Sequence, residues 1–384
     1  MSEIFKSDGN TAEISMMTER RIKTLQDLIE VCEIDTNIWE VEKWTQGKTD
    51  AWRKDRSVIW VVKDGKVQEG NVNDTGKILM RPTYQVKAWL VRKTIEIRNR
   101  LVVDDFIKNA KKYSPKYKRI QYKPTNDGCL YEIGLPDLQL GRLVMASEAG
   151  YDISPKIQIK KADMTIDKLV GYASTFSINR ILFPVGNDFF DANTAEMRTV
   201  HGTLQQDDVR WQKTFALGSD FMVRTIDKLS MIAPVDIMVI PGNHDEERIF
   251  YLGSYLSAWY HNNPNVKVDN EPRKRKYYSF GSNLIGLTHG YYEKNNKLDA
   301  LMAYEVPILW SKSTHREWHL GHTHHKADMI FKTDEFENGV VVRVLRSLSN
   351  PSVWEFDKGL VGSQKAVEAF LWHPTNGVVA QFTA

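Results

Sequence analysis

The sequence predicts an α/β protein in which a smaller α+β domain precedes a layered α/β domain. After about residue 126, short apolar stretches of strand length alternate with longer amphipathic stretches, a pattern typical of a buried sheet covered by helices. The chain has 384 residues, which exceeds one ordinary core of about 150 residues. We therefore expect two domains, at residues 1–125 and 126–384.

Composition places the chain among ordinary globular proteins. Hydrophobic residues make up 42% of it and charged residues 26%, which excludes general disorder. There is no run of about 18 apolar residues and no apolar signal core at the N-terminus, so we expect no membrane partner and a cytoplasmic location. Cys32 and Cys129 are far apart in sequence and are expected to be two buried thiols in a reducing compartment.

The first domain is expected to combine helices and strands. Residues 1–18 are polar and unpatterned, which is typical of a frayed tail. Apolar residues at helical spacing predict helices at residues 19–32 and 84–101. Residues 57–67 resemble two short strands joined by an Asp-Gly turn.

A lopsided charge distribution marks the end of this domain. Residues 92–123 contain eleven lysines and arginines, three acidic residues and three interleaved tyrosines. Such a stretch can neutralise phosphates and stack bases, which makes the domain a candidate nucleic-acid-binding module; the alternative is a solvated helix face. A second basic run at residues 273–276 can likewise neutralise phosphates, and the alternative for it is an exposed turn. The turn-forming residues 123–128 predict the domain boundary.

The second domain shows an alternation of apolar patterns. Helical spacing occurs at residues 163–176, 207–229 and 246–261. Strand-length apolar stretches lie at residues 130–135, 180–185, 236–240, 284–288, 318–320, 340–345, 366–372 and 378–382.

Five polar motifs each follow a predicted strand. They read PDLQLG (136–141), GNDFFD (186–191), PGNHDE (241–246), LTHG (287–290) and GHTHH (321–325). Side chains at the carboxyl ends of neighbouring strands converge on one crevice, and a His-x-His pair places two imidazoles on the same side of an extended segment. Each motif alone is a weak signal, but five in succession at strand ends favour a metal site.

In this order, the motifs resemble those of the calcineurin-like metallophosphoesterase superfamily, which run D-x-H, G-D-x-x-D, G-N-H-D/E, H and G-H-x-H. The resemblance covers the chain from about residue 130 to its C-terminal end. It implies a four-layer sandwich of two mixed sheets flanked by helices. The stretch EAGYD (148–152) is similar to phage-borne members, for which the cytoplasm would be that of the host.

The resemblance also implies two divalent ions and a set of ligands. Carboxylates and imidazoles suit Mn, which we favour, as well as Mg, Fe, Zn or Ni. Such ions activate a water molecule and neutralise phosphoryl oxygens. One ion would take Asp137, Asp188 and His324, and the other would take Asp188, Asn243, His289 and His322. His244 would be a general acid or a phosphate clamp, and Asp245 would orient it.

The sequence departs from the family pattern at two positions. The second motif has an extra Asn187 before Asp188, and Gln139 replaces the histidine of the first motif. Gln139 would ligate weakly through its carbonyl oxygen or would leave the first metal position poorly filled. Several histidines remain outside the motif positions, among them His201, His315, His319 and His325.

The function expected from these features is metal-dependent hydrolysis of phosphodiester bonds, foremost by a nuclease or phosphodiesterase acting on DNA. A resemblance to double-strand-break repair nucleases and the basic stretch both favour nucleic acid as partner. Two alternatives remain open. One is a phosphatase or phosphodiesterase for phosphoproteins or small nucleotides, and the other is a non-catalytic scaffold that lost turnover with the histidine at position 139. A homo-oligomer is also left open.

Overall fold

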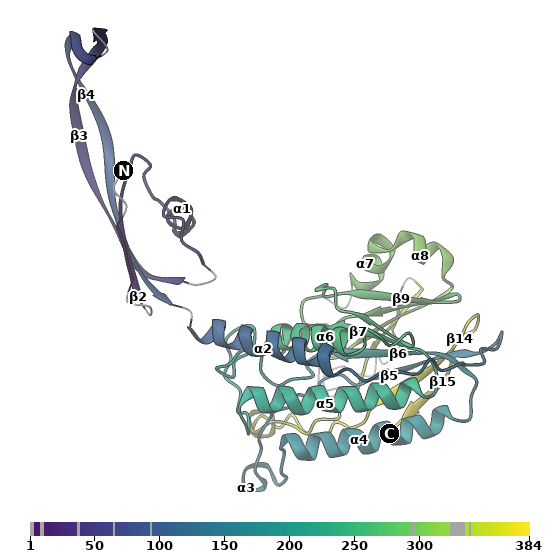
Figure 1. Ribbon diagram of the computed structural model, residues 1–384. Coiled ribbons are helices and arrows are strands. Elements are labelled where there is room, and N and C mark those ends of the chain that lie inside the picture. The colour runs from purple at the N-terminus through teal and green to yellow at the C-terminus, as the bar shows by residue number, and fades with distance from the viewer. Residues whose placement is uncertain are drawn as a thin grey trace. The chain divides into compact units, whose positions relative to one another are not determined.

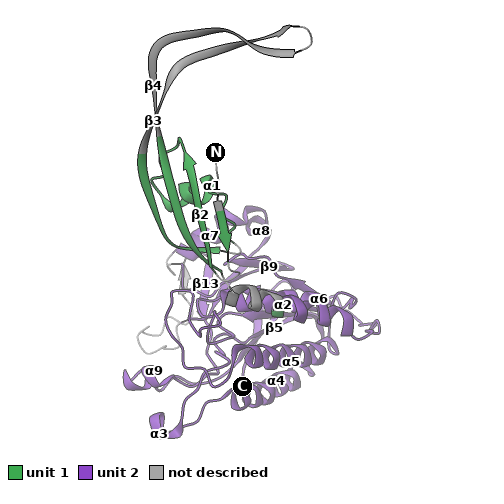
Figure 2. Ribbon diagram, turned by 60° about the vertical axis from the view of Figure 1, so that its left-hand side comes forward, with its two compact units in different colours: residues 1–102 green, residues 103–384 purple. Residues whose placement is uncertain are grey.

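A computed structural model describes residues 4–7, 11–36, 39–63, 66–92, 94–293, 297–322, 335–337 and 339–384. Side chains are described in all of these except residues 4, 49–82, 94–101 and 335–337. The chain divides into two compact units, Met1–Val102 and Val103–Ala384, which Figure 2 colours separately. The division falls inside helix α2 (Thr94–Tyr113), earlier than the turn at residues 123–128.

The first unit is built on an antiparallel sheet of strand order β1-β2-β4-β3. Its strands are β1 (Ile4–Ser7), β2 (Thr11–Thr18), β3 (Trp39–Lys63) and β4 (Lys66–Arg92). Helix α1 (Leu25–Val31) begins with a capping box in which Thr24 and Asp27 bond each other's backbone N–H groups. Leu28 of this helix packs against Ile14 and Leu90 of the sheet in one buried cluster.

Two sequence predictions for this unit are wrong. The expected tail contains β1 and β2, whose Ala12 and Ile14 are buried. Residues 84–92 belong to strand β4, and the helix starts only at Thr94. Val86, Ala88 and Leu90 are all buried, so every second residue faces the core, which is the period of a strand. Strands on both sides of β4 supply the pairing that local helical spacing could not reveal.

Residues 103–123, which include the second half of α2, are part of the second unit and pack within it. Phe106 packs edge-on against Phe215, with ring centroids 5.5 Å apart. Tyr117 donates a hydrogen bond to Asp227 (2.9 Å), and Tyr122 donates to the carbonyl of Ser230 (2.5 Å). Two of the three interleaved tyrosines therefore dock on residues of the second unit, which accounts for a unit boundary that falls inside the basic stretch and not at its end.

The second unit contains a six-stranded mixed sheet of order β15-β14-β5-β6-β7-β8. Strands β5 to β8 run parallel, whereas β14 and β15 are antiparallel to their neighbours. The strands are β5 (Cys129–Gly134), β6 (Ile178–Gly186), β7 (Val235–Ile240), β8 (Val266–Asp269), β14 (Glu368–His373) and β15 (Gly377–Thr383).

A second mixed sheet has five strands in the order β12-β13-β11-β10-β9, with β10, β11 and β13 parallel. Its strands are β9 (Lys276–Phe280), β10 (Asn283–Leu287), β11 (His315–Leu320), β12 (Glu335–Glu337) and β13 (Val340–Val344). The helices of this unit are α3 (Ala146–Ala149), α4 (Pro155–Ala173), α5 (Trp211–Ser230), α6 (Glu246–Trp259), α7 (Leu298–Glu305), α8 (Pro307–Lys312) and α9 (Val353–Asp357).

The main core of this unit lies between the two sheets. One buried cluster contains Leu130, Met238 and Trp372 of the six-stranded sheet together with Ile285 of the five-stranded sheet. The next residue along β5, Tyr131, points the other way and donates a hydrogen bond to the backbone of helix α4. Helices α4 and α5 lie side by side along that face of the sheet (Figure 1). The unit is thus a mixed α/β structure, in agreement with the predicted alternation.

A smaller cluster joins the second sheet to helix α7. Leu284 and Trp318 of the sheet pack against Leu298 and Met302 of the helix.

Among the described residues, no helix combines the length and the apolar character needed to cross a bilayer. Both cysteines are buried free thiols, as expected from the sequence.

Candidate metal centre

The five polar motifs lie at the carboxyl ends of parallel strands from both sheets. The first three follow β5, β6 and β7 of the six-stranded sheet, and the last two follow β10 and β11 of the five-stranded sheet. Glycine allows the loops to approach: a Cβ at Gly242 would stand 1.9 Å from Asp188 Oδ1. The carboxyl ends of the two sheets therefore bring distant motifs together.

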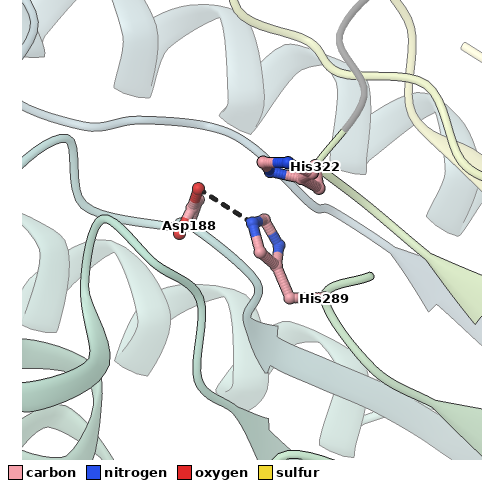
Figure 3. A group of neighbouring side chains, drawn as sticks. All are labelled: Asp188, His289 and His322. Atoms are coloured by element: carbon pink, nitrogen blue, oxygen red, sulfur yellow. Dashed lines mark ion pairs between the residues drawn. The ribbon is translucent and has the colours of Figure 1, made fainter. Parts of the chain in front are cut away.

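Three side chains from three motifs form a compact cluster (Figure 3). One ligand-type atom each of Asp188, His289 and His322 lies within 4.8 Å of the other two. His289 Nε2 is 3.0 Å from Asp188 Oδ2, and the two imidazole rings meet edge to face with centroids 4.9 Å apart. Asp188 and His289 are buried, and His322 is half-buried.

The environment of His289 favours a cation at its Nε2. The Nδ1 group donates a hydrogen bond to Asn187 Oδ1 at 2.7 Å, which fixes the orientation of the ring. Nε2 then faces Asn243 Oδ1 at 2.9 Å and Asp188 Oδ2 at 3.0 Å, and both of these oxygens are acceptors. A point between acceptors must be filled by the proton of an imidazolium or by a metal ion, so this donor set fits a divalent cation.

The charges of the cluster agree with a cation site. Burial alone would raise the pKa of Asp188, but the neighbouring His289 and His244 hold it well below its usual range. Burial and the charge of His289 lower the pKa of His322 to about 4, so its imidazole is neutral, which is the form that ligates metals. Burial acts against protonation of His289, yet Asp188 raises its pKa to about 9.

The first motif is tied to the same cluster. Asp137 Oδ2 accepts a hydrogen bond from the backbone N–H of His322 at 2.9 Å. Its own N–H donates to the carbonyl of Asn187, and Gln139 N–H donates to the carbonyl of Asp188. Asp137 and Gln139 are each only 1% exposed, and burial raises the pKa of Asp137 to about 7. His324 lies outside the described residues.

Comparison with known proteins fits this arrangement. The profile of the family described as calcineurin-like phosphoesterase matches residues 182–352. This part of the chain is therefore similar to a calcineurin-like phosphoesterase domain. The match begins at Leu182, so it includes the last four motifs of the phosphoesterase domain, while the Asp137 motif precedes it.

Solved structures add only a distant likeness to the phosphoesterase domain. Wild-type Vps29 from Entamoeba histolytica in complex with Zn²⁺ is 12% identical, with a TM-score of 0.28 over 66% of this chain and 98% of that one. A double mutant of the same protein gives 12% identity, the same coverage and a TM-score of 0.27. No curated protein matches the chain.

The predicted contact between His244 and Asp245 is replaced by other partners. Asp245 is fully buried and accepts hydrogen bonds from the backbone N–H groups of Gly242 (3.0 Å) and Phe190 (3.2 Å). It therefore fixes two motif loops of the phosphoesterase domain. His244 instead donates from Nδ1 to the carbonyl of Asp191 at 2.8 Å, and its backbone N–H donates to Asp188 Oδ1 at 2.8 Å. Adjacent side chains point apart here, so sequence proximity was misleading.

Arg142 is a structural residue of this domain that the sequence interpretation missed. It is 5% exposed and forms ion pairs with Asp191 (3.0 Å) and Glu355 (3.2 Å). Because Asp191 supplies the carbonyl that holds His244, Arg142 supports the loop behind that imidazole. The only signal in the sequence was an arginine directly after the PDLQLG motif.

Backbone strain is concentrated at the centre. Of seven described non-glycine residues with positive φ, five belong to the motifs: Asp137, Gln139, Asn187, Asp188 and His322. Such conformations cost roughly 1–3 kcal/mol each and persist where the surroundings enforce them, typically at functional sites. The fold therefore stabilises a ligand geometry that the local sequence would not adopt on its own.

Proposed function

We propose that this domain hydrolyses phosphodiester bonds with the help of two divalent cations, and that its two mixed sheets and outer helices form the four-layer arrangement of that superfamily. The observation that carries the proposal is the convergence of Asp188, His289 and His322 from three strand ends of two sheets. Such a cluster of one carboxylate and two imidazoles, surrounded by further acceptor oxygens, suits transition-metal chemistry.

The residues divide between two metal positions. Asp188 would be shared by both positions because its two oxygens can face different cations. Asn243, His289 and His322 would complete one position, and Asp137, Gln139 and His324 would complete the other. When bound, the ions would supply Lewis acidity toward phosphoryl oxygens and toward a water nucleophile.

His244 is suited to act on the leaving group. Its Nδ1 donates to the Asp191 carbonyl, so in the doubly protonated imidazolium Nε2 is the nitrogen that can give a proton to the departing oxygen, which leaves a neutral ring with its proton on Nδ1. The side chain is 18% exposed, which leaves it accessible to substrate. The hydrogen bond from its backbone to Asp188 keeps this imidazole next to the metal ligands.

Gln139 argues for manganese or magnesium at the first position. An amide oxygen is a harder and weaker donor than an imidazole nitrogen, so it favours these ions over zinc and iron. Titration of metal-free protein with Mn²⁺ is expected to show one tight ion and one ion that exchanges readily. Gln139→His should tighten the weaker ion, and two equally tight ions in the unmodified protein would contradict the assignment.

Nucleic acid is the substrate class that the surface favours. Seven cationic residues are exposed on the second half of α2 and the segment after it, and residues 106–126 contain no acidic side chain. We call this surface the basic ridge. Its members are Lys108, Lys111, Lys112, Lys116, Lys118, Arg119 and Lys123.

The run at residues 273–276 differs from the ridge because each of its cations has an acidic partner. Lys276 is buried against Asp269, and Arg275 pairs with Glu293 and Glu305. Arg273 pairs with Glu271, and Lys274 pairs with Glu246. A polyanion must compete with these carboxylates, so the ridge is the better site for phosphate contacts.

The test compares two sets of four charge removals. Lys111, Lys112, Lys116 and Lys118 are replaced by Ala in one variant, and the exposed Lys156, Lys160, Lys168 and Lys213 in the control. The ridge variant is expected to bind single- and double-stranded DNA more weakly and with a flatter salt dependence, because fewer counterions are released. Hydrolysis of bis-para-nitrophenyl phosphate by the Mn-loaded protein should be retained in both. Equal DNA affinity of the two variants at low salt would exclude the basic ridge as the DNA-binding surface.

A further inference from the structure

Two exposed aromatic residues follow the histidine motif of strand β10. Tyr291 is 39% exposed and Tyr292 is 42% exposed, although both lie within three residues of His289. Aromatic rings this accessible next to a buried polar centre are able to contact a partner that binds there. Their position, rather than their exposure alone, defines what that partner can be.

Tyr291 contacts the metal-ligand cluster directly. Its ring packs edge to face with that of His322, with centroids 4.9 Å apart at an interplanar angle of 88°. The exposed His201 lies on another side, with a centroid distance of 5.3 Å. A phosphate bound near His322 would therefore lie one side chain away from an accessible aromatic surface.

Tyr292 extends this surface toward a cation. Its ring meets that of Tyr291 at 82° with centroids 5.1 Å apart, and Lys274 Nζ lies 4.6 Å from its centroid. Its hydroxyl donates to Glu246 of the PGNHDE motif at 3.3 Å. The tyrosine pair is thus attached at one end to a metal-ligand histidine and at the other to the motif that carries Asn243 and His244.

We infer that Tyr291 and Tyr292 form a subsite that stacks an unpaired nucleobase beside the scissile phosphate. Every base offers a π-face to an aromatic side chain, so stacking holds a nucleotide without reading its sequence. The subsite rests on the proposed phosphodiesterase function, which it deepens by making the nucleoside next to the phosphate a determinant of specificity. A single-stranded or frayed end fits it, because a paired base is already stacked in the duplex.

The test uses three substrates with the same leaving group. Thymidine 5′-(para-nitrophenyl phosphate) and thymidine 3′-(para-nitrophenyl phosphate) carry a base, and methyl para-nitrophenyl phosphate does not. For the Mn-loaded protein, the measured quantity is the ratio of kcat/KM between each nucleoside substrate and the methyl substrate. Metal content and circular dichroism of each variant are recorded with it.

Tyr291→Leu is expected to lower this ratio about 5-fold to 100-fold for at least one isomer, the range seen when base-stacking rings are removed. Tyr292→Leu should lower it less. Tyr291→Phe keeps the ring and should keep the ratio, and so should Tyr304→Leu, which removes an 85% exposed tyrosine from helix α7.

Two outcomes separate the subsite from the proposed function. If the unmodified protein hydrolyses all three substrates and Tyr291→Leu leaves both ratios unchanged, the subsite is overturned and the phosphodiesterase remains. If no substrate is hydrolysed, the proposed function fails, and calorimetry then decides the subsite from the Kd values of thymidine monophosphate and methyl phosphate. Equal affinities for these two ligands, or equal loss of both in Tyr291→Leu, would overturn it.

Discussion

Two buried pairs of histidine and carboxylate, His289–Asp188 and His319–Glu132, show how similar chemistry serves different purposes. Their ion-pair distances are 3.0 Å and 2.8 Å, and in both pairs the carboxylate raises the pKa of the histidine to about 9 against the effect of burial. Burial and pKa therefore do not distinguish the candidate metal centre from an ordinary part of the core.

The balance of donors and acceptors does distinguish them. Around His319, Glu132 also accepts from the Trp372 indole (2.9 Å), and Glu317, at 3.3 Å from Nε2, also accepts from Arg343 (2.5 Å). Around His289, two ring nitrogens face three acceptors, on Asn187, Asn243 and Asp188. The carboxylates around His319 accept hydrogen bonds from other side chains as well, so this pair stabilises the fold. The surplus of acceptors around His289 instead suits a bound cation.

The strongest test of this contrast is Asp188→Asn. In the proposed arrangement Asp188 serves both metal positions, so neutralising it should remove both ions and all measurable turnover. Elemental analysis and hydrolysis of bis-para-nitrophenyl phosphate provide the readouts. Asp220→Asn, at an exposed position on α5, is the matched control and should change neither. Two retained ions with near-normal rates would show that Asp188 is no more a ligand than Glu132.

His244→Ala should separate chemistry from metal binding in the same cluster. This side chain is no ligand in the proposed arrangement, so metal content should persist while turnover falls about 10²-fold or more. The loss should be smaller for a para-nitrophenyl leaving group, which needs no proton, than for an alkyl leaving group. Equal losses on both would exclude proton donation and leave only a phosphate-binding role.

The His319–Glu132 pair should make the free energy of unfolding depend on pH. The folded-state pKa of His319, about 9, exceeds the ordinary value of 6.5, so its stabilisation is fully present below about pH 6.5 and is lost as pH rises through 9. This part of the pH dependence is on the order of 3 kcal/mol in the free energy of unfolding. Glu132→Gln should remove the larger share of it, and the remainder comes from Glu317, which also raises the pKa of His319. Urea unfolding at pH 6.5 and pH 9.5 measures it. If the unfolding free energy changed equally between pH 6.5 and pH 9.5 in the variant and in the unmodified protein, the pairing would be contradicted.

The smallest effect is expected at Asn187, which is the extra residue of the second motif. Asn187→Leu removes the acceptor that orients His289, so Mn²⁺ affinity should fall about tenfold, as for other residues that support a ligating imidazole. Asn187→Asp keeps an acceptor and should lose less. Calorimetric titration of the metal-free protein gives both values, and NMR of the imidazole nitrogens shows whether the tautomer of His289 has changed. Unchanged affinity in Asn187→Leu would assign the residue to loop structure alone.

Much of the phosphoesterase domain could be predicted from the sequence because its strands are continuous apolar stretches that end in polar motifs. All eight expected strands and three expected helices occur, with shifted ends. The first unit resisted prediction because residues 84–92 also fit a helical spacing, and only pairing with β2 and β3 decides between the two. The strand-end rule indicated that Asp188, His289 and His322 would meet. It could not show that Asp245 turns away from His244, because side-chain direction in a tight loop depends on backbone angles.

The position of strand β14 has a consequence for synthesis of the chain. β14 (Glu368–His373) lies beside β5 in the sheet, with Trp372 opposite Leu130, so the strand that leads into the first motif is paired on that side by residues that are synthesised after all five motifs. Every motif is complete by residue 325. A premature stop codon between residues 326 and 367 would therefore preserve all candidate ligands and still leave β5 as an open, mostly apolar edge, yielding a product suited to degradation or aggregation rather than to catalysis.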